Sequence, residues 1–171
     1  KLMQIKEFQH VKPGKGPAFV RTKMRGIEDG RVLDHTFPSG HKIDIVRIEN
    51  RSYQYLYKEN DGYHFMNTSN YEQVFIESHM IDQPDFLKEG IICTIIFHAE
   101  EEMPLLVEQP QFLSTEVTYT EPGIKGDTAT NTMKPATIET GAKVKVPLFI
   151  NTGDLIKVDI QKGMYVERIK S

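Results

Sequence analysis

The sequence lacks most of the features that would tie it to a membrane, a disulfide framework or a metal-dependent enzyme. It contains a single cysteine, Cys93, among 171 residues, which excludes an internal disulfide framework and a cysteine-based zinc site. Its longest apolar run, residues 91–97, is far shorter than the roughly 20 residues of a membrane helix. The sequence does not begin with a basic segment followed by an apolar run, so it predicts no signal peptide. We therefore predict a cytoplasmic protein with neither a membrane partner nor a metal centre.

The motifs of common enzyme classes are also missing. There is no nucleophile elbow, no histidine pair at helical spacing and no dinucleotide-binding glycine pattern. The six histidines are scattered along the chain. The three adjacent glutamates at residues 100–102 fit a solvated turn better than a pair of catalytic carboxylates. The sequence therefore predicts a protein that is not an enzyme and needs no cofactor.

What the sequence does have is an ordinary apolar content, 39%, and an unevenly distributed charge. Residues 1–45 carry a net charge of +4, residues 46–109 carry −8 and residues 110–171 carry +1. Three stretches of different charge indicate three modules, with boundaries near residues 45 and 109. Only the first stretch is basic enough to attract phosphate groups.

Alternation of apolar and polar residues recurs along the chain and predicts β-strands. In residues 18–25, for example, Arg21, Lys23 and Arg25 would share one face of a strand. The one helix we expect is short and covers residues 83–88. Many short strands separated by Gly, Pro, Asn and Asp are typical of small barrels, so we predict an all-β fold of three barrels in tandem. The predicted strands are residues 2–9, 18–25, 43–49, 53–57, 63–67, 91–98, 105–108, 115–119, 143–148, 155–160 and 164–169.

The most distinctive motif lies between the first two predicted strands and reads Lys12-Pro13-Gly14-Lys15-Gly16-Pro17. Glycines on both sides of Lys15 remove side-chain bulk, and the prolines stiffen the approach and the exit. The motif does not fit a phosphate-binding P-loop, because no Ser or Thr follows the lysine. It predicts a narrow hairpin arm with one cation at its tip. The alternative is a plain turn that happens to hold a lysine.

A second unusual stretch is the long polar loop over residues 121–135. Loops of this length in small barrels are either functional or disordered. Gly126, Asp127 and Thr128 could offer backbone donors and short polar side chains to nucleic acid, as OB-type barrels often do. The alternative is a plain connector.

Together these motifs resemble the bacterial elongation factor P family along essentially the whole chain. The third module carries the most specific part of the resemblance, at residues 144–150. The matching segments are Glu7-Phe8-Gln9-His10-Val11-Lys12-Pro13-Gly14-Lys15-Gly16, Tyr55-Leu56-Tyr57, Phe65-Met66, Tyr71-Glu72-Gln73, Thr120-Glu121-Pro122-Gly123-Ile124-Lys125-Gly126-Asp127-Thr128, Lys134-Pro135-Ala136, Thr140-Gly141, Val144-Lys145-Val146-Pro147-Leu148-Phe149-Ile150 and Gly153.

The resemblance implies an L-shaped protein with an SH3-like barrel over residues 1–45 and two OB-type barrels over 46–109 and 110–171. It implies a translation elongation factor that binds the ribosome between the peptidyl-tRNA and exit sites and relieves stalling at consecutive prolines. It places Lys15 at the acceptor end of the peptidyl-tRNA, where a lysine-modifying enzyme extends this residue in many members. The supporting loop residues are Lys12, Pro13, Gly14, Gly16 and Pro17. The candidate RNA or ribosome contacts are Arg21, Lys23, Arg25, Gly126, Asp127, Thr128, Tyr165 and Arg168.

The chain begins inside the first barrel of the family pattern, so we expect that barrel to lack its opening strands here. We also expect a monomer. One alternative is the elongation-factor-P-like paralogue, and the other is a stand-alone OB-type RNA-binding protein. The acidic middle module fits either a contact with a basic ribosomal protein or freedom from RNA.

Overall fold

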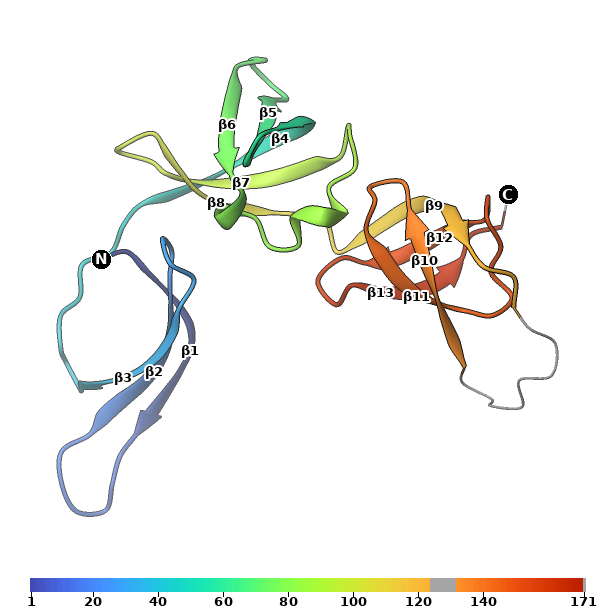
Figure 1. Cartoon of the computed structure of the whole chain (residues 1–171). Coiled ribbons are helices and arrows are strands. Elements are labelled where there is room, and N and C mark those ends of the chain that lie inside the picture. Colours follow the sequence, from blue (N-terminus) through green and yellow to red (C-terminus); the bar gives the residue numbers. More distant parts are fainter. Residues whose placement is uncertain (124–131, 171) are drawn as a thin grey trace.

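The computed structural model describes residues 1–123 and 132–170, whose strands form three separate antiparallel sheets. Figure 1 shows the three sheets along a bent path, with the middle module at the bend. The helical turns among the described residues are two short 3-10 turns, η1 (Ser78–Met80) and η2 (Pro84–Phe86). These observations confirm the predicted all-β class with three modules.

The first module is an open, curled sheet of three strands in the order β1-β2-β3. Within residues 1–47, all of which the structure describes, no apolar side chain is buried, and Thr22 is the one buried polar side chain. Phe8 is 72% exposed and Val32 is 59% exposed. Backbone pairing therefore holds this module together more than a core does. Its strands are β1 (Met3–Val11), β2 (Phe19–Gly26) and β3 (Val32–Pro38).

The middle module is a five-stranded sheet in the order β6-β5-β4-β7-β8. Its inward face is rich in aromatic rings, and Phe65, Ile76 and Ile95 are completely buried. Alternate residues of each strand point inward because side chains alternate across a pleated strand. The strands are β4 (Ile48–Glu59), β5 (Gly62–Asn67), β6 (Gln73–Glu77), β7 (Ile92–His98) and β8 (Met103–Glu108).

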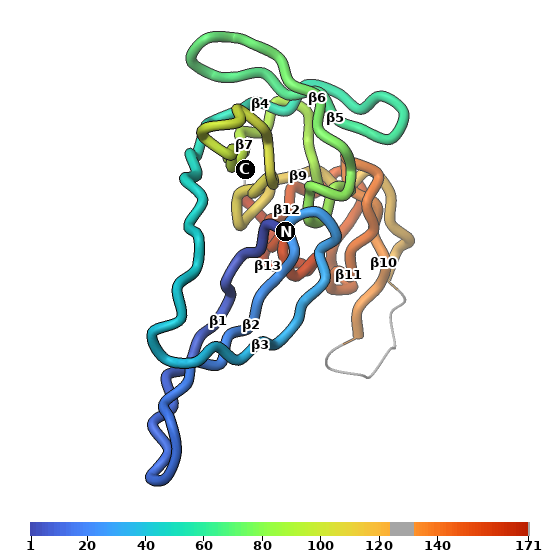
Figure 2. Tube along the Cα trace, turned by 90° about the vertical axis from the view of Figure 1, so that its left-hand side faces the viewer, coloured from blue at the N-terminus to red at the C-terminus, as the bar shows by residue number. Residues whose placement is uncertain are grey.

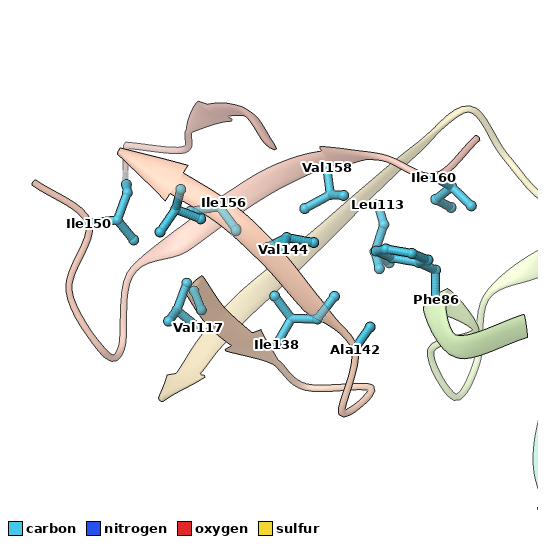
Figure 3. Packing of buried hydrophobic residues seen from close by; sticks show 12 residues of the cluster. Phe86, Leu113, Val117, Ile138, Ala142, Val144, Ile150, Ile156, Val158 and Ile160 are labelled. Atoms are coloured by element: carbon cyan, nitrogen blue, oxygen red, sulfur yellow. The ribbon is translucent and has the colours of Figure 1, made fainter. Parts of the chain in front are cut away.

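The third module is a five-stranded sheet in the order β11-β10-β9-β12-β13. The two ends of this order, β11 and β13, also contact each other, so the sheet curls toward a closed barrel. Val117, Ile150 and Ile156 are completely buried in its core (Figure 3). The strands are β9 (Phe112–Thr120), β10 (Met133–Ile138), β11 (Lys143–Pro147), β12 (Leu155–Asp159) and β13 (Met164–Arg168).

Several local predictions were wrong. The predicted helix over 83–88 is only the 3-10 turn η2, and residues 43–47 form no strand although their apolar residues alternate. Strands β3, β6 and β10 were not predicted. In β10, Pro135 masks the strand pattern. It lies opposite Lys145 of β11, and pairing with β9 begins only at Ala136.

The middle and third modules meet through an apolar contact. Phe86, which belongs to η2 of the middle module, is buried in the core of the third module (Figure 3). Ile91 packs against the cores of both modules. Beside this contact, Lys88 Nζ lies 3.0 Å from Glu139 Oε2. This junction therefore continues the core of the third module into the middle one.

Candidate functional site

The lysine motif lies at the end of a paired two-stranded arm. Strands β1 and β2 are in register from Met3 opposite Gly26 to Val11 opposite Phe19, with one irregularity between Ile5 and Glu7. Residues 12–18 connect the two strands. In this turn Gly16 has a φ of +111°, a conformation that residues with a side chain rarely adopt. The glycine after Lys15 is therefore required by the backbone of the turn itself.

Lys15 is exposed at the tip of this arm. Among the residues that the structure describes, none forms an ion pair or hydrogen bond with its ammonium group. A Cβ added to Gly14 would meet nothing within 4 Å, so the space beside Lys15 is open. Figures 1 and 2 both show the arm pointing away from the other two modules. The Lys15 ammonium is thus presented to solvent at the end of a narrow support.

The three cations of β2 have different surroundings, although the sequence presents them as one row. Arg21 is exposed, and its Cζ lies 5.5 Å from the centre of the Phe19 ring. Lys23 is also exposed, and its Nζ lies 3.6 Å from a Glu7 oxygen. Both can still contact an external phosphate. Arg25 is half-buried and bound to another module.

Arg25 forms the side-chain link between the first and middle modules. Its Nη1 and Nη2 donate to the two Asp82 oxygens at 3.1 and 3.0 Å. The hydrogen bond from Arg25 holds the pKa of Asp82 below its ordinary value, and the same bond raises the pKa of Arg25. Two of the five guanidinium donors are therefore engaged within the chain.

A polar cavity of about 610 Å³ lies beside this ion pair, where all three modules approach one another. Lys6 lines it from the first module, Gln109 from the end of the middle module and Gln161 from the third. Gln109 Nε2 donates to the Asp82 and Gln83 carbonyl oxygens at 2.8 and 2.9 Å. The first module is therefore joined to the rest by polar contacts around a hollow.

Tyr165 and Arg168, the candidate contacts near the C-terminus, lie on β13. Tyr165 is half-buried against the third core, and this burial raises the pKa of its hydroxyl. Arg168 is exposed, with Nη1 3.9 Å from Asp154 and Cζ 5.4 Å from the centre of the Phe149 ring. Its guanidinium thus already has a carboxylate and a ring as neighbours. Gly126, Asp127 and Thr128 lie outside the described residues.

Other reactive groups do not form a site in the described chain. Burial raises the pKa of the Cys93 thiol to about 12, so it stays protonated at neutral pH. Across residues 1–123 and 132–170, no three His, Cys, Asp or Glu side chains cluster as metal ligands. In the same residues, no helix has the length and apolar character needed to cross a membrane.

Three family models match successive parts of the chain. The model described as "Elongation factor P (EF-P) KOW-like domain" matches residues 1–43. The one described as "Elongation factor P (EF-P) OB domain" matches residues 48–106. The one described as "Elongation factor P, C-terminal" matches residues 113–168. Together these matches span all three sheets.

Curated relatives match over nearly the full length. The protein named "Elongation factor P" from Flavobacterium psychrophilum is 54% identical over 169 residues, which cover 99% of this chain and 90% of that protein. The "Elongation factor P" of Azobacteroides pseudotrichonymphae is 58% identical over 166 residues, 97% of this chain and 89% of that protein. A solved structure titled eukaryotic translation initiation factor 5A from Methanococcus jannaschii has a TM-score of 0.45 and 24% identity, covering 61% of this chain and 80% of that one.

Proposed function

This chain belongs to the elongation factor P family and is a translation elongation factor, and we propose that it stimulates peptide-bond formation at consecutive prolines. In this proposal it binds the ribosome between the peptidyl-tRNA and exit sites. Lys15 reaches the acceptor end of the peptidyl-tRNA. The observation that carries the proposal is the exposed Lys15 ammonium at the end of the paired β1–β2 arm.

Positioning is the physical basis of the proposed mechanism. Proline is a poor nucleophile and reacts slowly when the two substrates are badly oriented. Holding reactants in a productive geometry can lower a barrier by up to ~7–11 kcal/mol in ideal cases, and a small share of that suffices here. Lys15 would neutralise a tRNA phosphate and restrict the acceptor end. No proton transfer by the protein is needed, so we propose that it acts without a catalytic residue or cofactor.

The rest of the arm supports this role. The loop residues Lys12, Pro13, Gly14, Gly16 and Pro17 keep the tip narrow enough to approach RNA. Arg21 and Lys23 are the exposed cations of β2 that could contact the tRNA backbone. Arg25 would contribute less, because Asp82 already occupies two of its donors.

Contacts of the third module complete the proposed interface. We propose that Tyr165, Arg168 and the polar loop with Gly126, Asp127 and Thr128 face ribosomal RNA. The whole chain would act as a monomer in the cytoplasm. Because Lys15 is exposed at the tip, a lysine-modifying enzyme could reach its ammonium group.

The test replaces Lys15 and a matched lysine outside the arm. Lys15→Ala should leave the free energy of unfolding within about 0.5 kcal/mol of the parent, because the side chain is exposed and unpaired within the described structure. In reconstituted translation with this variant, the yield of a full-length reporter that contains consecutive prolines should fall to the level seen without the factor. A proline-free reporter should be unaffected. Lys42→Ala removes an equally exposed charge from the connection after β3 and should rescue the proline reporter normally.

Two results would contradict the proposal. If Lys15→Ala rescues the proline reporter as well as the parent does, Lys15 is not the residue that stimulates peptide-bond formation. If both variants fail equally, the loss reflects net charge and not the tip. Lys15→Arg separates charge from lysine chemistry, because it keeps the charge but blocks a lysine-specific extension. It should work partly if Lys15 acts unmodified and fail if an extension is needed.

A further inference from the structure

The outer face of the sheet formed by β4, β5 and β6 carries an aromatic row. Tyr57 on β4 lies opposite His64 on β5, which lies opposite Phe75 on β6. The Tyr57 and His64 rings are stacked with centres 4.5 Å apart, and the His64 and Phe75 rings meet edge to face at 5.2 Å. Tyr57 is 46% exposed and Phe75 is 49% exposed. We call Tyr57, His64 and Phe75 the aromatic row.

Carboxylates border the aromatic row on the same face. Two residues away along each strand, Glu59 lies opposite Gly62, which lies opposite Glu77. The Phe75 ring covers Gly62 so closely that a Cβ there would lie 2.0 Å from the ring. Glu59, Gly62 and Glu77 therefore lie on the same face as the aromatic row. The Glu59 and Glu77 side chains are 58% and 64% exposed. A half-exposed aromatic surface is thus edged by negative charge.

The chain itself twice combines a ring and carboxylates to hold an arginine. Arg51 Cζ lies 4.4 Å from the centre of the Phe97 ring, and its donors bond to Glu102 and Glu49. Arg168 makes a looser version of this arrangement, with its Cζ 5.4 Å from the centre of the Phe149 ring and its Nη1 3.9 Å from Asp154. Rings attract cations by their quadrupole, and carboxylates bind the guanidinium edge.

The aromatic row has the same components, and within the described chain its carboxylates contact histidines and no Lys or Arg. Glu59 Oε2 lies 2.8 Å from His64 Nε2, and Glu77 Oε2 lies 3.2 Å from His79 Nδ1. Among the described residues, no Lys or Arg lies over Tyr57 or Phe75, whereas Lys157 lies over the exposed Phe112 ring at 4.4 Å. Figures 1 and 2 both show β4, β5 and β6 at the end of the middle module away from the other two. An external group can therefore reach this face.

We propose that this face is a docking surface for a basic protein segment that places an arginine on the aromatic row. Residues 46–109 carry a net charge of −8, so the charge of the module complements such a partner. The same carboxylates would repel the phosphates of RNA. Arginine fits better than lysine because its flat guanidinium can stack on a ring while it bonds to Glu59 or Glu77. This surface is separate from the Lys15 arm, and the proposal does not depend on the proposed function.

The test uses the full chain and a short fluorescent peptide of alternating arginine and glycine, with binding followed by anisotropy. The double variant Tyr57→Leu/Phe75→Leu keeps apolar bulk but removes the rings, and it should bind the peptide about fivefold more weakly. Phe112→Leu is the matched control, since that ring already has its own cation, and it should bind like the parent. The same peptide with lysine in place of arginine should bind the parent more weakly.

Two further measurements test the carboxylates and the rings separately. Glu59→Gln/Glu77→Gln should weaken binding more than Glu100→Gln/Glu101→Gln, which changes the net charge equally in the turn between β7 and β8. In the parent, the peptide should shift the NMR signals of the Tyr57 and Phe75 rings, a readout that needs no variant to fold. Equal losses in both glutamate pairs, or unshifted ring signals, would overturn the proposal. Ring shifts caused by a short oligouridine in place of the peptide would overturn it in favour of RNA.

Discussion

Phe86 reaches from the middle module into the core of the third, whereas the first module is joined to the middle one by the Arg25–Asp82 ion pair. The Phe86 side chain is only 6% exposed. The Asp82 side chain is 72% exposed and lies beside a polar cavity. The same chain therefore uses an apolar contact at one junction and a solvated charge contact at the other.

The two junctions should differ in how far the modules beside them can move. Burying an aromatic side chain contributes several kcal/mol, and the contact cannot slide without opening a cavity. An ion pair with one partner exposed to solvent, as Asp82 is here, contributes about 0–1 kcal/mol and can break and re-form. The middle and third modules should therefore behave as one body. The first module, with the Lys15 arm, should adjust its angle, which suits an arm that must meet a tRNA end.

The largest effect is expected from Phe86→Ala. Removing this ring leaves a cavity in the third core, and we expect a loss of about 3 kcal/mol in the free energy of unfolding. Urea unfolding followed by circular dichroism would measure it. Phe8→Ala, at a phenylalanine that is 72% exposed, is the matched control and should change stability by no more than about 0.5 kcal/mol. Equal small losses would mean that Phe86 does not join the two modules.

A smaller effect on stability, but a clear one on orientation, is expected from Arg25→Met. The variant should lose at most about 1 kcal/mol, because the Asp82 end of the ion pair is exposed to solvent. Residual dipolar couplings should nevertheless report a wider range of orientations for the first module relative to the middle one. Lys88→Met removes the Lys88–Glu139 ion pair of the other junction and should leave the middle and third modules aligned. Greater freedom there would show that charge, and not Phe86, holds that junction.

The smallest effect concerns the titration of Asp82. Its pKa lies below the ordinary value of 3.8, chiefly because Arg25 donates hydrogen bonds to it. Its contribution to stability is therefore complete above about pH 3.8 and is lost as the pH falls through the lowered pKa. Arg25→Met should raise the pKa of Asp82 toward 3.8, measured from the carbon-13 shift of its carboxyl group. An unchanged pKa would mean that the ion pair does not form in solution.

The local fold could be predicted where alternation was clear. Residues 18–25 and 143–148 lie almost wholly on the observed β2 and β11, because alternate burial leaves a direct trace in the sequence. Strand β3 was missed because nearly all its residues are exposed, so burial leaves no pattern in it. The apolar residues Ile43 and Ile45 misled for the opposite reason, since both are exposed in a connection.

Some residues of the candidate site could also be predicted from local sequence, and others could not. The tip at Lys15 could be predicted because glycine and proline constrain the backbone within a few residues of one another. The role of Arg25 could not, because Asp82 is 57 residues away and nothing local marks the pair. The aromatic row was missed as well. It depends on a register shift between Tyr55 and Tyr57 that brings Tyr57 opposite His64.

Residue types and neighbours along the chain are enough to specify the all-β class, the charge difference between modules and the lysine-tipped turn. The entry of Phe86 into the third core, the Arg25–Asp82 ion pair and the three rings on one face of a sheet depend on how the chain packs. These contacts join residues on different strands, turns or modules. Strand order, register and module packing select them, and the period of a single strand carries no information about its partners.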